Sequence, residues 1–119
     1  YLIKNDFFPF NNKESFFAMT AHIILNKIDN KNTVTHSKKV IKLIRNKIKF
    51  RNLLISDDLS MKSLKGTLEE NTIKTFKAGC NLALHCNGNL SEMEIVGKNS
   101  PVTDKFINQK TSQFYKFLS

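Results

Sequence analysis

Two adjacent carboxylates, Asp57 and Asp58, directly follow a short apolar run at residues 52–56. In a parallel α/β fold, the residues just past the carboxyl ends of the strands converge on the ligand. A carboxylate in that position could hold a metal ion, abstract a proton or attack a sugar carbon. A structural interpretation is equally open, in which one of the two acids caps the following turn near Ser60.

Two further polar clusters occupy comparable positions, at residues 20–22 with His22 and at residues 85–87. The two cysteines, Cys80 and Cys86, have no C-x-x-C partner and no clustered histidine, so the sequence does not support a zinc site. A secreted disulfide scaffold of this size would carry more cysteines. We therefore expect two buried, reduced thiols in a cytosolic protein.

The elements that must position these clusters follow from the apolar periodicity and the capping residues. Buried strands are predicted at residues 15–24, 52–56 and 81–86. A helix capped by Thr35 or Ser37 buries Val40, Ile41, Ile44 and Ile48, and a second, over residues 69–79, buries Ile73 and Phe76 and stops at Gly79. A short helix is expected at residues 91–97 and a terminal one at residues 104–118, with Phe106, Phe114 and Phe117 as its buried positions.

Strands that alternate with helices imply parallel strands joined by crossover helices. Near-continuous apolar strands are typical of a sheet covered on both faces. A closed (β/α)₈ barrel needs about 250 residues, so 119 residues are either the last third of such a barrel or a small open sheet. The residue pattern alone leaves both architectures open.

The net charge of +9 often indicates a nucleic-acid or anionic-surface partner. All but two of the 19 basic residues are scattered lysines, however, whereas base and phosphate readers favour arginine. A solvated lysine-rich surface is therefore the preferred interpretation. The longest nearly apolar stretch, residues 16–25, is about half of a membrane span of roughly 20 residues, so we expect no transmembrane segment.

Four segments, in the right order and spacing, resemble bacterial β-N-acetylhexosaminidases of glycoside hydrolase family 3, the NagZ type. The most specific is Ile-Ser-Asp-Asp-Leu-Ser-Met at residues 55–61, which is similar to the family's nucleophile segment. The supporting ones are Asp-Phe-Phe-Pro-Phe at residues 6–10, Ala-Met-Thr-Ala-His-Ile at residues 18–23, and Ala-Gly-Cys-Asn at residues 78–81 with Leu-His-Cys-Asn at residues 84–87.

The resemblance implies a partial (β/α)₈ barrel, units six to eight, with residues 1–119 as one C-terminal portion of the catalytic domain and a tail helix at about 101–118. It implies a retaining glycosidase that acts on N-acetylglucosamine-containing glycans or muropeptides in the bacterial cytoplasm. Asp57 maps to the catalytic nucleophile, and Asp58 and His22 to the substrate pocket. His22 could equally be a satisfied packing histidine. The implied chemistry needs no cofactor and no metal, and no membrane or nucleic-acid partner is expected.

The family's Lys-His-Phe-Pro-Gly-His-Gly segment and its acid/base loop have no match here, and neither His36 nor His85 sits in that motif. The chain begins at Tyr1 rather than methionine, so we expect a processed or excised piece of something longer. The isolated chain is then expected to be inactive, with the missing N-terminal half of the barrel as a partner. The alternatives are a non-catalytic truncated remnant and a lysine-rich module that binds nucleic acid or an anionic surface.

Overall fold

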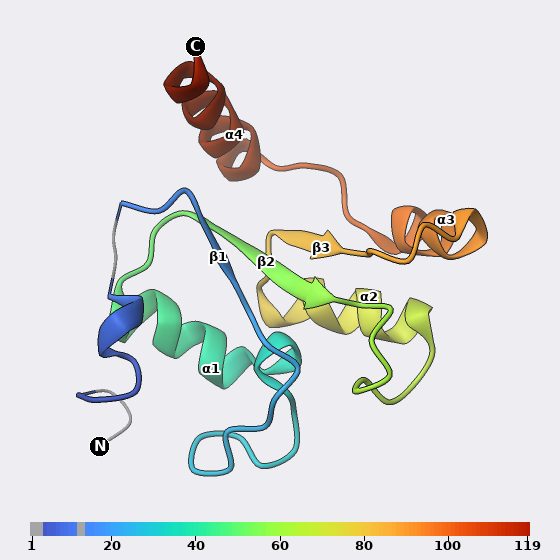
Figure 1. Ribbon diagram of the computed structural model, residues 1–119, viewed down its shortest axis with the longest axis horizontal. Helices are drawn as coiled ribbons and strands as arrows, with labels where there is room; N and C mark the ends of the chain where they lie inside the picture. The colour runs from blue at the N-terminus through green and yellow to red at the C-terminus, as the bar shows by residue number, and fades with distance from the viewer. Residues whose placement is uncertain (1–3, 12–13) are drawn as a thin grey trace.

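A computed structural model describes residues 4–11 and 14–119, arranged around a three-stranded parallel sheet in the order β1-β2-β3 (Figure 1). The strands are β1 Phe17–Met19, β2 Leu53–Asp58 and β3 Leu82–Leu84; the helices are α1 Lys38–Leu43, α2 Leu68–Ala78, α3 Leu90–Asn99 and α4 Lys105–Leu118. Two 3-10 helices lie at η1 Phe8–Phe10 and η2 Val34–His36, and the π-helix η3 Ile44–Ile48 directly follows α1. The predicted parallel sheet with helical crossovers is confirmed.

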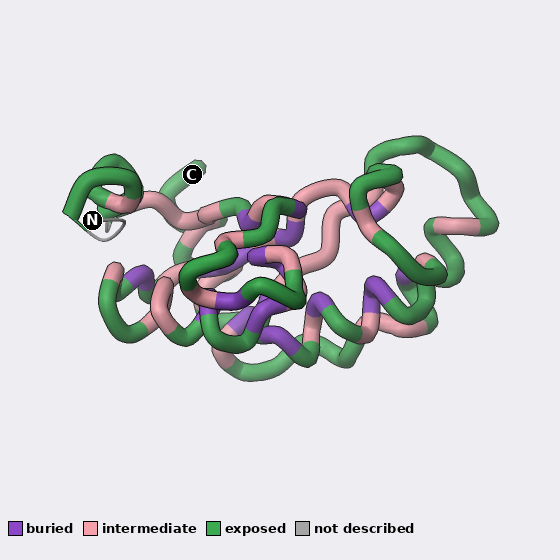
Figure 2. The backbone as a smooth tube through the Cα atoms, turned by 90° about the horizontal axis from the view of Figure 1, so that it is seen from below, coloured by how far each residue is buried: buried purple, intermediate pink, exposed green. Residues whose placement is uncertain are grey.

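Helices α1 and α2 cover one face of the sheet through a single hydrophobic cluster. Ile41 of α1 and Ala78 of α2 meet Leu54 of the central strand, together with Phe50 and Cys80. Leu54 is 1% exposed. Figure 2 shows the buried residues gathered in the middle of the molecule, with exposed segments around them. The core therefore fixes the central strand, and with it the carboxylates at its end.

The helix ends follow the capping chemistry that the sequence carries. The Ser37 side chain accepts the Val40 N–H at the start of α1, as predicted, and Asp104 caps α4 through the Ile107 N–H. Thr67 and Glu70 form a reciprocal capping box at the start of α2. The predicted stop at Gly79 is confirmed, since this glycine ends α2 with a φ of 118°, in the left-handed region.

The buried face of α2 differs from the prediction. Its buried positions are Asn71, Thr72, Thr75 and Ala78, whereas Ile73 and Phe76 are only partly buried. The Thr72 and Thr75 hydroxyls each donate to the backbone carbonyl four residues earlier, at 2.7 and 2.8 Å. Because these hydrogen bonds satisfy the hydroxyl groups within the helix, burying the threonine side chains costs little free energy. The buried positions therefore keep helical spacing although three of the four are polar.

Three other expectations need correction. The strand predicted over residues 15–24 is limited to β1, because the chain bends after Met19 and leaves Ile23 and Ile24 exposed. The buried residue of α4 is Ile107; the predicted positions Phe106 and Phe114 are only partly buried, and Phe117 is 73% exposed. The rings of Phe114 and Phe117 both contact that of Phe16 before β1. Cys80 is a buried free thiol as predicted, but Cys86 lies exposed after β3.

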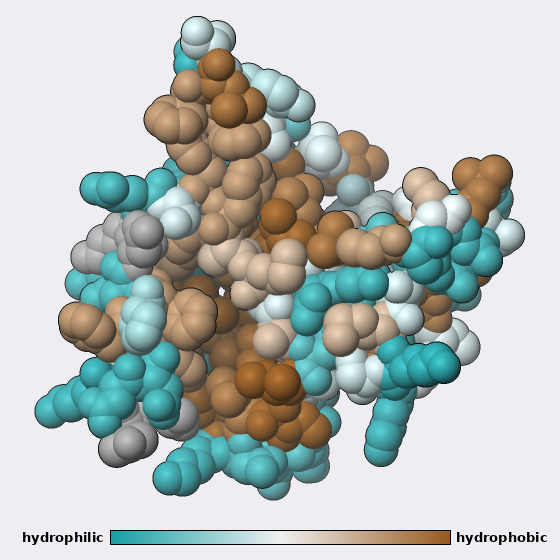
Figure 3. All heavy atoms as spheres, in the orientation of Figure 1, coloured by the Kyte–Doolittle hydropathy of each residue, from teal (hydrophilic) through white to brown (hydrophobic). Residues whose placement is uncertain are grey.

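The sheet keeps exposed apolar side chains on the surface seen in Figure 3, where a hydrophobic band runs from α4 along β1 to the segment after it. Met19, Ile23 and Ile24 are all exposed. A short three-stranded sheet leaves both edge strands without a further strand beside them within residues 4–11 and 14–119. In the described part of the chain, no helix is long and apolar enough to cross a membrane.

The polar segment before α1 is organised by Asp29, a buried carboxylate that accepts hydrogen bonds from the Ser37 hydroxyl at 2.7 Å, from Asn32 and from the Lys31 N–H. These hydrogen bonds, that of Ser37 first, hold the pKa of Asp29 far below its ordinary value. The stabilisation is therefore complete above the unfolded-chain pKa of about 3.9 and is lost as the pH falls below it.

We expect Asp29→Asn to lower the melting temperature by several degrees at pH 7 and by less at pH 3, because the stabilisation disappears only as the pH approaches the folded-state pKa. Thermal unfolding followed by circular dichroism at the two pH values measures this difference. An equal loss at both pH values would contradict the role of the ionised carboxylate.

Candidate active site

The two candidate acids lie at the carboxyl end of the central strand, since Asp57 and Asp58 are the last two residues of β2. Four residues of β2, from Ile55 to Asp58, oppose three of β3, from Leu82 to Leu84, so the strand bulges there. A bulge turns side chains away from simple alternation and is frequent beside active sites. The sequence predicted that this strand ends before the acids, whereas the acids belong to it.

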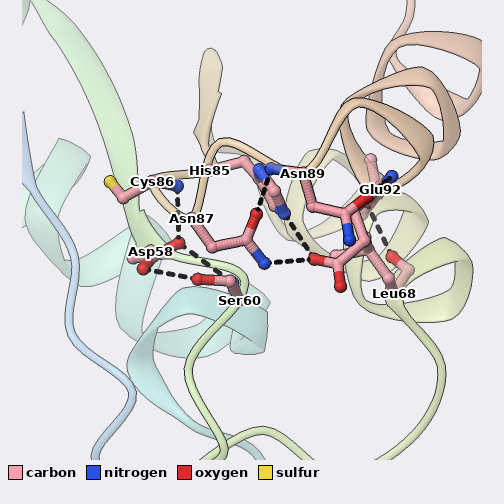
Figure 4. Close-up of polar contacts among 9 residues, drawn as sticks. Asp58, Ser60, Leu68, His85, Cys86, Asn87, Asn89 and Glu92 are labelled. Carbon is pink, nitrogen blue, oxygen red and sulfur yellow. Dashed lines mark hydrogen bonds and ion pairs between the residues drawn. The ribbon is translucent and has the colours of Figure 1, made fainter.

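Asp58 is held by three hydrogen bonds (Figure 4). Its carboxylate accepts from the Ser60 N–H at 3.0 Å, the Ser60 hydroxyl at 2.7 Å and the Cys86 N–H at 3.1 Å. Burial alone would raise the pKa of Asp58, but these hydrogen bonds outweigh it and keep the pKa below its ordinary value. Asp58 thus caps the turn at Ser60 and joins the end of β2 to the segment after β3.

Asp57 is bound much more lightly. Within the described residues its half-buried carboxylate accepts one hydrogen bond, from the N–H of its neighbour Asp58 at 2.9 Å. Most of its lone pairs are therefore left for a ligand. The residue pattern alone left the two acids equivalent, and the structure separates them: Asp58 has the capping role, and Asp57 has a carboxylate largely available for chemistry.

His22 lies between the ends of β1 and β2 and is 9% exposed. Its Nδ1 is 3.0 Å from the Thr35 hydroxyl, and its Nε2 is 2.9 Å from the backbone carbonyl of Asp58, to which it donates. The ring therefore connects the Thr35 side chain, through Nδ1, to the backbone at Asp58, through Nε2. Its predicted place in a substrate pocket stays a prediction.

A second polar group lies beside the acids, at the start of α3 (Figure 4). The Glu92 carboxylate accepts from His85 Nε2 at 2.7 Å and from the Asn87 side-chain amide at 2.6 Å, both on Oε2. The hydrogen bond from His85, followed by that from Asn87, lowers the pKa of Glu92. The His85 side chain is 5% exposed, and its Nδ1 has no hydrogen-bond partner among the described residues.

The sequence singles out residues 85–87 as a polar cluster at the end of a strand, but it does not identify their partner Glu92. One signal was available, because Asn87-Gly88-Asn89 predicts a tight turn that brings α3 back toward the end of β3. Asn89 indeed caps α3 by accepting the Glu92 N–H. In residues 4–11 and 14–119, no group of three or more His, Cys, Asp or Glu side chains is placed to hold a metal ion.

Comparison with known families and sequences agrees with the motif at the end of β2. The family profile for the glycosyl hydrolase family 3 N terminal domain matches residues 2–115. The beta-hexosaminidase of Idiomarina loihiensis is 27% identical over 97 residues, which are 80% of this chain and 29% of that protein. The beta-hexosaminidase of Methylobacillus flagellatus is 34% identical over 71 residues, 58% of this chain and 20% of that protein.

Comparison with solved structures supports the same grouping. The beta-N-acetylglucosaminidase from Thermotoga maritima superposes with a TM-score of 0.70 at 27% identity, covering 98% of this chain and 29% of that one. The small α/β arrangement with its parallel sheet is thus consistent with part of such a barrel domain. The chain spans less than a third of the length of these two curated relatives.

Proposed function

The chain belongs to glycosyl hydrolase family 3, and we propose that it carries the nucleophile of a retaining β-N-acetylhexosaminidase, Asp57. The observation that carries the proposal is the contrast at the end of β2. There, Asp58 is occupied by three hydrogen bonds, while Asp57 accepts only one. A retaining glycosidase needs one ionised carboxylate free to attack the sugar.

In the proposed reaction, a carboxylate oxygen of Asp57 attacks the anomeric carbon of an N-acetylglucosamine residue. The bond between that carbon and the leaving oxygen breaks, and a general acid gives the leaving oxygen a proton. The resulting glycosyl ester is hydrolysed by a water molecule whose proton returns to the same group. In this proposal His22 and Asp58 hold the nucleophile segment in place, and Asp58 is also a proposed contact of the sugar.

We place the proton-transferring group outside residues 1–119. Of the three described histidines, His22 uses both ring nitrogens and His85 is paired with Glu92, while the unpartnered Nε2 of His36 is buried in the segment before α1. The proposal assigns the sheet to barrel units six to eight, with the preceding units supplied by another part of the enzyme. The two bare edges of the sheet and the exposed Met19, Ile23 and Ile24 are surfaces that such units would cover.

The proposed substrates are N-acetylglucosamine-containing glycans or muropeptides, and the proposed location is the bacterial cytoplasm. Support for the substrate class comes from the Ser-Asp-Asp-Leu-Ser-Met string at residues 56–61 and from relatives named beta-hexosaminidase. No cofactor enters the proposed reaction.

The test is a barrel chimaera, in which this chain replaces the matching 29% of the Thermotoga maritima enzyme. We expect the chimaera to release 4-nitrophenol from 4-nitrophenyl N-acetyl-β-glucosaminide. The isolated chain should show no release above that of its own Asp57→Asn variant.

Turnover by the isolated chain would contradict the external proton donor. A folded chimaera without turnover would instead favour the alternative of a non-catalytic remnant.

A further inference from the structure

A cavity of about 270 Å³ lies beside the candidate active site, between the loop 59–66 and the first turns of α2 and α3. We call it the rim cavity. Its apolar wall includes Leu59, Leu64 and Ile95, and its polar wall consists of Ser60, Asn71 and Glu92. Asp57 does not line it, so the rim cavity is distinct from the space above the nucleophile.

Asn71 gives the cavity an unsatisfied acceptor. The residue is 3% exposed, and its side-chain Oδ1 has no hydrogen-bond partner in the described part of the chain. A buried carbonyl oxygen without a partner is costly and rare in native proteins. Asn71 lines the cavity, so a ligand with an N–H or O–H group could donate the missing hydrogen bond to its Oδ1.

Glu92 gives the same cavity a negative charge. Its Oε2 accepts both hydrogen bonds, from His85 and Asn87, while its Oε1 accepts none from the described residues. The lowered pKa, caused first by the His85 hydrogen bond, keeps the carboxylate ionised at neutral pH. Glu92 is therefore a fixed anion with one oxygen still available.

The surrounding charge is opposite in sign to that of the whole chain. Residues 57–94 hold six of the ten acidic residues but only four of the nineteen basic ones, so this end of a chain with net charge +9 is locally acidic. Lys62 and Lys65 lie in the cavity loop itself, and six acidic against four basic residues still give the segment 57–94 a net charge of −2. The local field thus favours a cation.

We propose that the rim cavity binds a primary alkylammonium group, with Glu92 as its counter-ion and Asn71 Oδ1 as an acceptor. An ammonium group has three donors and no acceptor, which matches the two unsatisfied oxygens. Its methylene chain packs against Leu59, Leu64 and Ile95. The volume lies just below the usual range of roughly 300–1,000 Å³ for drug-sized ligands, which suits a lysine-type side chain.

The experiment titrates the ¹⁵N-labelled chain with n-butylammonium and, in parallel, with n-butanol and butyrate. We expect saturable shifts of the Asn71 side-chain amide and the Gly66 amide with n-butylammonium alone. Nα-acetyl-lysine methylamide should shift the same signals if the group is peptide-borne. If n-butylammonium binds but Nα-acetyl-lysine methylamide does not, the cavity is assigned to free amines. Either result supports recognition of an alkylammonium group.

Two variants locate the binding. Glu92→Gln should weaken n-butylammonium binding by about tenfold, whereas Glu94→Gln, the same charge change on the exposed side of α3, should leave it within about twofold. Asn71→Leu should remove saturable binding without lowering the melting temperature, because it replaces an unpaired buried oxygen by an apolar group.

The proposal is overturned if n-butylammonium produces no saturable shift, if butyrate binds as well, or if Glu92→Gln and Glu94→Gln behave alike. Asp57→Asn should leave the binding unchanged, since Asp57 does not line the cavity. Loss of glycosidase activity and loss of n-butylammonium binding can therefore be told apart.

Discussion

Asp57→Asn in the barrel chimaera is expected to lower kcat/KM for 4-nitrophenyl N-acetyl-β-glucosaminide by roughly 10⁴-fold or more, the scale on which loss of a covalent nucleophile acts. Asparagine keeps the size of the side chain but has no anionic oxygen to form the glycosyl ester. Among the described residues, the Asp57 carboxylate accepts one hydrogen bond, from the Asp58 N–H, and the amide oxygen of asparagine can accept the same bond. The melting temperature should therefore stay within about 2 °C of the parent.

The matched control is Asp58→Asn, one residue further along the same strand. Asp58 accepts three hydrogen bonds that join β2 to Ser60 and Cys86, so this variant should lower the melting temperature. Two opposite patterns are thus expected, loss of chemistry at position 57 and loss of stability at position 58. Asp57→Asn retaining a tenth of the activity would move the nucleophile elsewhere.

Leu54→Ala is expected to destabilise the isolated chain by about 2–5 kcal/mol, the usual cost of a cavity in a close-packed core. Leu54 is 1% exposed and lies in the cluster that joins the central strand to α1 and α2, with Ile41 and Ala78 as neighbours. Small domains have only about 5–15 kcal/mol of stability in total, so the effect should be close to global.

Urea unfolding followed by circular dichroism measures this loss. Met19→Ala provides the comparison, because Met19 is 58% exposed on β1 and its truncation should change stability by about 0.5 kcal/mol or less. If both variants lose the same free energy, the core is not centred on Leu54.

The parallel sheet and the helix ends could be predicted because they depend on local chemistry. Apolar strands that alternate with amphipathic helices predict parallel strands joined by crossover helices. Serine and aspartate are favoured at helix N-caps and glycine at the C-terminal end of a helix, which is where Ser37, Asp104 and Gly79 lie. The family motif at residues 55–61 can likewise be identified from its own contiguous sequence. In each case the signal lies within a few residues of the structure it predicts.

The features that escaped prediction depend on contacts distant in the sequence. The burial of Thr72 and Thr75 follows from the packing of α2 on its neighbours and not from hydropathy. The division of roles between Asp57 and Asp58 depends on Cys86, 28 residues further on. The pairing of His85 with Glu92 needs the turn after β3, and the rim cavity needs three separate segments to meet.

The most direct measurement of the central claim is covalent trapping of the glycosyl ester. The barrel chimaera is treated with a fluorinated N-acetylglucosaminyl fluoride, whose leaving group departs without protonation and whose ester turns over slowly. Trypsin then releases residues 52–62, which carry both aspartates, and fragmentation by tandem mass spectrometry assigns the adduct. We predict one sugar on Asp57 and none in the Asp57→Asn variant. A sugar on Asp58, or an unlabelled peptide from an enzyme that the reagent has inactivated, would contradict the assignment.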